Sequence, residues 1–129
     1  MKFIDEIKAR AKQDVKTIVL PETRDKRTLI AAAQVLKEGT AKLVMVGDEE
    51  KIRDGAHWLD VELDGITVVN PETSPKLDEY VNLLYELRKK KGMTLESARE
   101  QLLNNYIMFG VMMVKCKDAD GMVAGCCHA

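Results

Sequence analysis

Four short apolar runs, separated from one another by helical patterns, limit the fold of this chain more than any other feature. The first three are rich in β-branched residues, and a Pro or Gly soon follows each run; the runs cover residues 17–20, 43–46, 66–69 and 120–124. Short continuous runs of this kind are typical of strands that are buried on both faces of a parallel sheet. We therefore expect an α/β fold of three layers, in which helices cover both faces of a mainly parallel sheet.

The segments between the runs show the periodicity of amphipathic helices. The predicted helices span residues 2–13, 25–38, 48–56, 75–91 and 94–104. Residues that can start or stop a helix stand at their ends: Gly39, Asp48, Pro75, Gly92 and Thr94. Residues 106–116 are apolar on almost every side, so a helix in this segment should be buried on most sides.

Length, hydropathy and charge exclude several classes of protein. The 129 residues suit one domain. The apolar stretch 106–114 is far shorter than the roughly 20 residues that cross a bilayer, and carboxylates occur within the first eight residues. We therefore expect no membrane association, no secretory signal and a cytoplasmic location. A net charge of −1 and six aromatic residues provide neither a basic surface nor a stacking platform, so nucleic acid is not an expected partner.

The cysteines form no recognisable metal or disulfide pattern. They are Cys116, Cys126 and Cys127, and His128 follows the adjacent pair. Structural zinc sites use pairs such as Cys-x-x-Cys, and an odd count with two adjacent cysteines is a poor disulfide framework. We expect no metal site and a reducing compartment. The sequence also lacks the glycine-rich motifs of nucleotide enzymes and the Gly-x-Ser-x-Gly motif of hydrolases.

Arg88 is a charged residue that helical spacing places on an apolar face. It continues the stripe of the predicted helix 75–91, which is formed by Leu77, Tyr80, Val81 and Leu84. A buried guanidinium must be paired or face a polar cleft, and its donors suit phosphate or carboxylate. The preferred interpretation is that Arg88 faces inward to bind an anion. The alternative is that Arg88 and the three lysines after it place positive charge at a helix C-terminus.

Ligands of open parallel sheets bind beyond the carboxyl ends of the strands. The candidate site loops are therefore the segments that follow the four runs, namely residues 21–27, 47–48, 70–74 and 125–129.

Six segments, in order along the whole chain, resemble the phosphate acetyltransferase family, also called phosphotransacetylases. They read TIVLPE (17–22), RT (27–28), PETSPK (71–76), YELRKKKG (85–92), FGVMMV (109–114) and DGMVAG (120–125), and His128 follows the last one. The resemblance implies a two-domain enzyme, usually a homodimer, with an architecture like that of isocitrate and isopropylmalate dehydrogenases. It also implies transfer of an acetyl group between coenzyme A and inorganic phosphate, which gives acetyl phosphate, in a cleft between the domains.

Coenzyme A is a substrate in this family, and no tightly bound cofactor is expected. In the family's proposed mechanism an aspartate assists the coenzyme A thiolate in its attack on acetyl phosphate. A serine and arginines stabilise the transition state.

The resemblance also assigns roles to residues of this sequence. Arg88 matches a family arginine that is linked to substrate binding and catalysis. Gly125, His128 and Ala129 match the start of a loop that leads to a second arginine, and they are expected to line the substrate cleft. That arginine, the serine and the aspartate have no counterpart in the 129 residues. We therefore expect residues 1–129 to be the truncated N-terminal part of the domain, inactive alone and with apolar surface exposed.

Three other interpretations stay open. A phosphate butyryltransferase would share the same motifs and differ in an acyl pocket. The acetyltransferase-like region of some malic enzymes has the same fold, and it senses acyl-CoA without catalysis; Met1 so close to the first strand argues against it. A stand-alone α/β binding domain of unrelated origin would leave the six ordered segments unexplained.

Overall fold

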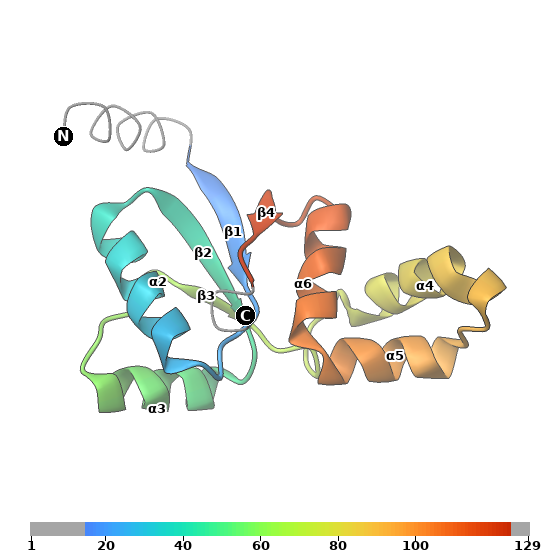
Figure 1. Cartoon of the computed structure of the whole chain (residues 1–129), viewed down its shortest axis with the longest axis horizontal. Coiled ribbons are helices and arrows are strands. Elements are labelled where there is room, and N and C mark those ends of the chain that lie inside the picture. Colours follow the sequence, from blue (N-terminus) through green and yellow to red (C-terminus); the bar gives the residue numbers. More distant parts are fainter. Residues whose placement is uncertain (1–14, 125–129) are drawn as a thin grey trace.

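The computed structural model describes residues 15–124, which Figure 1 colours along the chain. Its elements are β1 (Lys16–Leu20), α2 (Lys26–Glu38), β2 (Ala41–Val46), α3 (Glu49–Leu59), β3 (Thr67–Val69), α4 (Leu77–Arg88), the 3-10 turn η1 (Lys89–Lys91), α5 (Leu95–Asn104), α6 (Tyr106–Lys115) and β4 (Gly121–Met122). The helix predicted for residues 2–13 lies outside the described residues.

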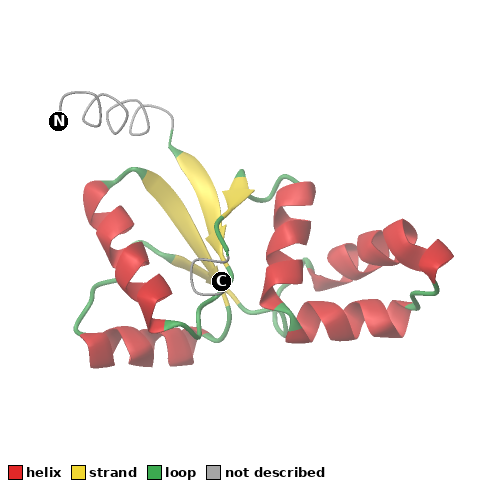
Figure 2. Cartoon of the chain, viewed as in Figure 1, coloured by secondary structure: helices red, strands yellow, loops and turns green. Residues whose placement is uncertain are grey.

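The strands form one sheet in the order β3-β2-β1-β4, and every neighbouring pair is parallel. Lys16 of β1 pairs with Ala41 of β2, and the register continues to Leu20 opposite Met45. Helices α2 and α3 lie on one side of the sheet, whereas α4, α5 and α6 lie on the other (Figures 1 and 2). The predicted three-layer α/β fold with a parallel sheet is confirmed.

Alternate side chains of β2 serve two separate cores. Leu43 and Met45 pack with residues of α2 and α3, whereas Val44 and Val46 pack with residues of α4, α5 and α6. Strand side chains alternate between the two faces of a sheet, so a strand that is apolar throughout can fill both layers. This arrangement explains why the short apolar runs could be recognised as strands.

The helix ends follow the sequence signals closely. The side chain of Asp48 accepts a hydrogen bond from the backbone N–H of Lys51 at 3.2 Å, and Thr94 with Ser97 forms a capping box. Gly39 and Gly92 adopt left-handed conformations at helix ends, as predicted.

Several elements differ in extent from their predictions; α3, for example, continues to Leu59, beyond the predicted end at residue 56. The predicted helix 75–91 is α4, Leu77–Arg88, followed by the 3-10 turn, because Arg88 leaves helical geometry with φ −125° and ψ 4°. The strand predicted over 120–124 is only Gly121–Met122, at the edge of the sheet, where it pairs with β1. Helix α6 is buried on most sides, as predicted, and its exposed residues Ile107, Val111 and Lys115 form a single stripe.

In residues 15–124 no helix is long and apolar enough to span a membrane.

Candidate functional site

The loop after β1 and the start of α6 enclose a hollow of about 410 Å³ at the carboxyl end of the sheet. We call this feature the strand-end hollow; it is lined by Pro21, Glu22, Thr23, Arg24, Asp25, Asn104, Asn105, Tyr106 and Ile107. Helices α2 and α6 both begin at this end of the sheet (Figure 1). The hollow therefore lies where ligands of open parallel sheets bind.

Thr23 and Gly47 fix the floor of this region. The Thr23 hydroxyl is buried and donates a 2.8 Å hydrogen bond to the carbonyl oxygen of Val46. A Cβ atom on Gly47 would lie 2.6 Å from Thr23 Oγ1 and 3.5 Å from Cε2 of Tyr106. The contact with Thr23 leaves no room for a side chain at position 47, and Tyr106 lies at ordinary van der Waals distance, so the end of β1, the end of β2 and the start of α6 meet here.

Two guanidinium groups lie in the loop at the rim of the hollow: that of Arg27 is paired with Asp25, and that of Arg24 has no ion pair within residues 15–124. The carboxylate of Asp25 caps α2 by accepting the N–H of Arg27, and it also accepts from Arg27 Nε at 3.3 Å. Arg24 lies over the ring of Tyr106, with 5.2 Å between its Cζ and the ring centroid. Arg24 has no ion pair within residues 15–124, so its donors are available to a ligand.

A second hollow, of about 350 Å³, adjoins the loop that follows β3. Asn70 shapes this loop by accepting a 3.0 Å hydrogen bond from the N–H of Glu72. Tyr80 donates a hydrogen bond to Asp118, and Lys76 Nζ lies 3.7 Å from the other oxygen of Asp118. Burial, and then the hydrogen bond to Asp118, raises the pKa of Tyr80 far above its ordinary value. Tyr80 is therefore a structural donor at neutral pH and not an acid–base group.

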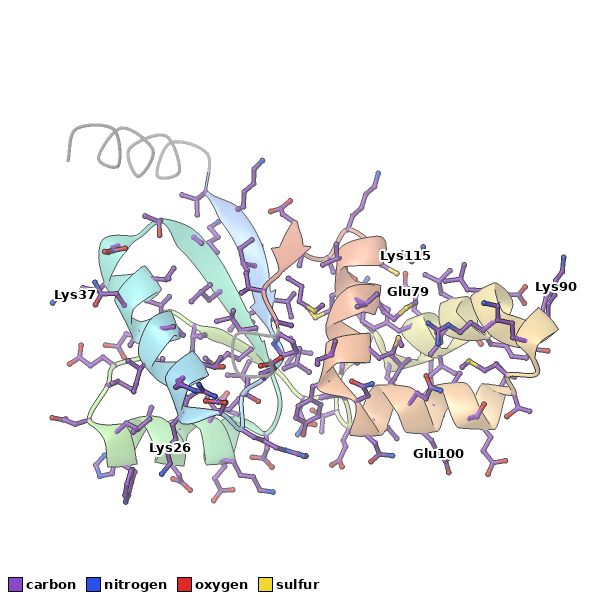
Figure 3. All side chains as sticks on the ribbon, viewed as in Figure 1. Lys26, Lys37, Glu79, Lys90, Glu100 and Lys115 are labelled. Carbon is purple, nitrogen blue, oxygen red and sulfur yellow. The ribbon has the colours of Figure 1, made fainter. Side chains whose placement is uncertain are left out.

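The structure places Arg88 away from both hollows. The stripe before it is buried as predicted, including Tyr80 and Leu84, but Arg88 itself is exposed. Its side chain has no hydrogen bond or ion pair within residues 15–124. Lys90, two residues further on, lies at the outer end of the α4–α5 pair, far from the sheet (Figure 3). The expectation that Arg88 faces inward is wrong for this part of the chain, because the helix and its buried stripe end at this residue.

The other predicted site residues fall outside the described part of the chain. Gly125, His128 and Ala129 are among residues 125–129, as are two of the three cysteines. Cys116 is half-buried, and burial raises the pKa of its thiol. Within residues 15–124, no group of three or more His, Cys, Asp or Glu side chains could hold a metal ion.

Sequence reasoning singled out the loop 21–27 but missed its partner at the start of α6. Asn105 caps α6 by accepting the N–H of Met108 at 3.2 Å, and this brings Tyr106 over the hollow. The cap itself was a readable signal, because Asn directly before an apolar helical run favours a helix start. The pairing of Arg24 with Tyr106 is a tertiary contact that no local pattern reveals.

Comparison with known proteins identifies the family. A family model described as phosphate acetyl/butaryl transferase matches residues 2–129. The chain belongs to this family. It is 50% identical to the phosphate acetyltransferase of Acetivibrio thermocellus over 125 residues, which are 97% of this chain and 37% of that protein. It is 48% identical to the phosphate acetyltransferase of Thermoanaerobacterium thermosaccharolyticum, with 100% of this chain and 38% of that protein covered.

Solved structures agree with this assignment to the phosphate acetyl/butaryl transferase family. A EutD phosphotransacetylase from Staphylococcus aureus matches with a TM-score of 0.85 and 37% identity, over 99% of this chain and 38% of that one. A phosphotransacetylase from Streptococcus pyogenes matches with a TM-score of 0.87 and 32% identity, over the same shares. The chain thus spans less than two-fifths of the length of these relatives.

Proposed function

We propose that this chain is the N-terminal part of an acyltransferase that moves an acetyl group between coenzyme A and inorganic phosphate. The observation that carries the proposal is the match to the family over residues 2–129, together with relatives that are named phosphate acetyltransferases. A phosphate oxygen attacks the thioester carbonyl of acetyl-CoA, the C–S bond breaks, and the products are acetyl phosphate and the coenzyme A thiolate. In the reverse direction the thiolate attacks acetyl phosphate and releases phosphate.

Positive groups aid this chemistry because negative charge develops on the carbonyl oxygen and is already present on the phosphate. Arg88 is the family's arginine by resemblance, and its exposure in residues 15–124 leaves its guanidinium accessible to a substrate or to a further part of the enzyme. Gly125, His128 and Ala129 belong to the proposal as residues of the substrate cleft. Coenzyme A enters as a substrate, with no tightly bound cofactor.

The proposal also covers the location and the oligomeric state of the enzyme. We place it in the cytoplasm as a homodimer, with no nucleic-acid or membrane partner. Residues 1–129 alone are expected to be inactive, because the second arginine, the serine and the aspartate of the family have no counterpart in them.

A chimera tests the proposal directly. Residues 1–129 replace the matching segment of the Acetivibrio thermocellus enzyme, to which they are 50% identical. The chimera should form acetyl-CoA from acetyl phosphate and coenzyme A, and the isolated 129-residue chain should not. Circular dichroism and a melting curve establish that the chimera is folded. A folded chimera without activity, beside an active parent enzyme, would refute the proposal.

Acyl preference is tested in the full-length enzyme, because residues 1–129 are not expected to complete the acyl pocket. The family description includes both acetyl and butyryl transfer, whereas the relatives named above are acetyltransferases. We expect a higher kcat/KM for acetyl phosphate than for butyryl phosphate. The reverse order would assign the chain to the butyryl branch.

A further inference from the structure

We infer that Arg24 binds a phosphate group of the substrates at the strand-end hollow, and that the ring of Tyr106 holds its guanidinium ready for that contact. The class of ligand rests on the proposed function. The position rests on the geometry of the loop after β1 and of the start of α6.

The first support is the lack of a neutralising partner for Arg24. Arg27, the other arginine of the same loop, is paired with Asp25, whereas Arg24 has no ion pair within residues 15–124. The Arg24 guanidinium lies over the ring of Tyr106, with 5.2 Å between its Cζ and the ring centroid. Because the Arg24 guanidinium is not ion-paired to a carboxylate, it can form charge-assisted hydrogen bonds with an anion that enters the hollow.

The second support is the way in which the guanidinium is held. A guanidinium stacked on an aromatic face keeps its in-plane N–H donors free, and these donors match two oxygens of a phosphate. Tyr106 is itself fixed, because it follows the Asn105 cap and because its Cε2 lies close to Gly47. The ring already restricts the side chain of Arg24, so Arg24 loses less conformational entropy when it binds phosphate.

The third support is the electrostatic setting of the hollow. Its lining includes the caps of two helices, Asp25 before α2 and Asn105 before α6. Helix N-termini carry partial positive charge, which favours anions. The volume of about 410 Å³ falls in the range of small-molecule sites.

Two carboxylates line the same hollow and lower its affinity for phosphate. Asp25 is compensated by Arg27, whose Nη2 lies 3.2 Å from Asp25 Oδ2. Glu22 is half-buried and adds negative charge, so it should weaken binding of any anion. We therefore expect a weak, rapidly exchanging phosphate site, and we expect the neutral variant Glu22→Gln to bind phosphate more tightly.

The experiment uses the ¹⁵N-labelled 129-residue chain and inorganic phosphate at constant ionic strength. NMR follows the Arg24 Nε–Hε signal and the backbone amides of Arg24 and Tyr106. These signals should shift in a saturable manner, and Arg24→Met should weaken the affinity by about tenfold. Arg24→Lys keeps the charge without the planar fork, so it should bind with intermediate affinity. Arg53→Met is the matched control, because Arg53 is exposed on α3 and does not line the hollow; it should bind like the wild type.

Separate titrations identify the source of the phosphate. Acetyl phosphate, coenzyme A and dephospho-coenzyme A are compared with pantetheine, which has no phosphate group. Saturable shifts at Arg24 with any phosphate compound and none with pantetheine support the inference, and the compound that binds most tightly identifies the substrate. Shifts that are unaffected by Arg24→Met, or that gather at Arg88 and its lysines, would overturn it.

The two proposals fail in different ways. An inactive chimera with phosphate binding at Arg24 would remove the acyltransferase assignment and leave the phosphate site. An active chimera whose KM values are unchanged by Arg24→Met, with no shift at Arg24 in the 129-residue chain, would remove the phosphate site alone.

Discussion

The hydroxyl of Thr23 donates a 2.8 Å hydrogen bond to the carbonyl oxygen of Val46, and this contact ties the loop after β1 to the last residue of β2. Thr23 is only 7% exposed, so water cannot easily replace the lost donor. Thr23→Val should lower the free energy of unfolding by about 1–2 kcal/mol. Urea denaturation measures the change, with Thr23→Ser as a control that keeps the hydroxyl. Equal stability of the valine and serine variants would show that the hydrogen bond contributes nothing.

Gly47→Ala should destabilise the chain through both its contact and its backbone. The new Cβ would meet Thr23 Oγ1 at 2.6 Å, and Gly47 has a φ of 157° that side chains rarely adopt. We expect a loss of roughly 1–3 kcal/mol in the free energy of unfolding. Gly65→Ala is the matched comparison, since Gly65 also has a positive φ but has no atom near its Cβ position. A smaller loss at Gly47 than at Gly65 would contradict the close approach described here.

Tyr80→Phe tests the buried phenol and its pH dependence. The variant loses the hydrogen bond to Asp118, which should cost about 1–2 kcal/mol at neutral pH. Burial and the Asp118 contact raise the pKa of Tyr80 above the value of 10.0 that applies in the unfolded chain. The folded state therefore retains this proton more strongly, so the advantage of tyrosine is complete below about pH 10 and declines as the pH rises further.

The measurement for Tyr80 is the difference in unfolding free energy between wild type and variant from pH 7 to pH 11. Tyr85→Phe, on the same helix, is the control for the loss of a phenol. A difference that grows above pH 10 would have the opposite sign to that required by a raised pKa.

Leu84→Ala and Leu87→Ala compare the two sides of α4. Leu84 is 1% exposed in the core, whereas Leu87 is 50% exposed. We expect a loss of about 2–5 kcal/mol for Leu84→Ala and a change within about 0.5 kcal/mol for Leu87→Ala. Thermal unfolding measures both variants. Similar melting temperatures would mean that the buried stripe of α4 is placed wrongly.

Arg88→Ala separates a packing role from a substrate role. Arg88 is exposed and has no side-chain partner within residues 15–124, so the variant should unfold within about 0.5 kcal/mol of the wild type. In the chimera the same substitution should lower kcat/KM for acetyl phosphate and coenzyme A while the melting temperature stays the same. Unchanged kinetics would show that the family role of this arginine does not extend to this chain.

Much of the fold could be predicted because its signals are local. Pro21, Gly47 and the caps Asp48 and Thr94 mark ends that the structure retains. Continuous apolar runs predicted a parallel sheet because such strands can pack on both faces, and β2, which serves both cores, illustrates this directly.

The candidate site was less predictable because its decisive contacts join distant segments. The helical spacing of Arg88 assumed that α4 and its core continue past Leu84, but the backbone changes direction at Arg88 itself. The sequence also could not show which side of α6 stays exposed, because hydropathy describes the residues of a helix and not the neighbours that cover them. Arg24 and Tyr106 lie 82 positions apart in the sequence, and they meet only in the folded chain, where the loop after β1 adjoins the start of α6.

Because β2 fills both helical layers with alternate side chains, its register is fixed from two sides at once. A shift of one residue would turn Leu43 and Met45 toward α6 and Val44 toward α2, and every pair with β1 and β3 would be broken in the same step. A shift in the register of β2 would therefore disturb the packing of both helical layers at once. The ends of β1 and β2, and with them the walls of the strand-end hollow, are therefore held in a single alignment by six residues of one strand.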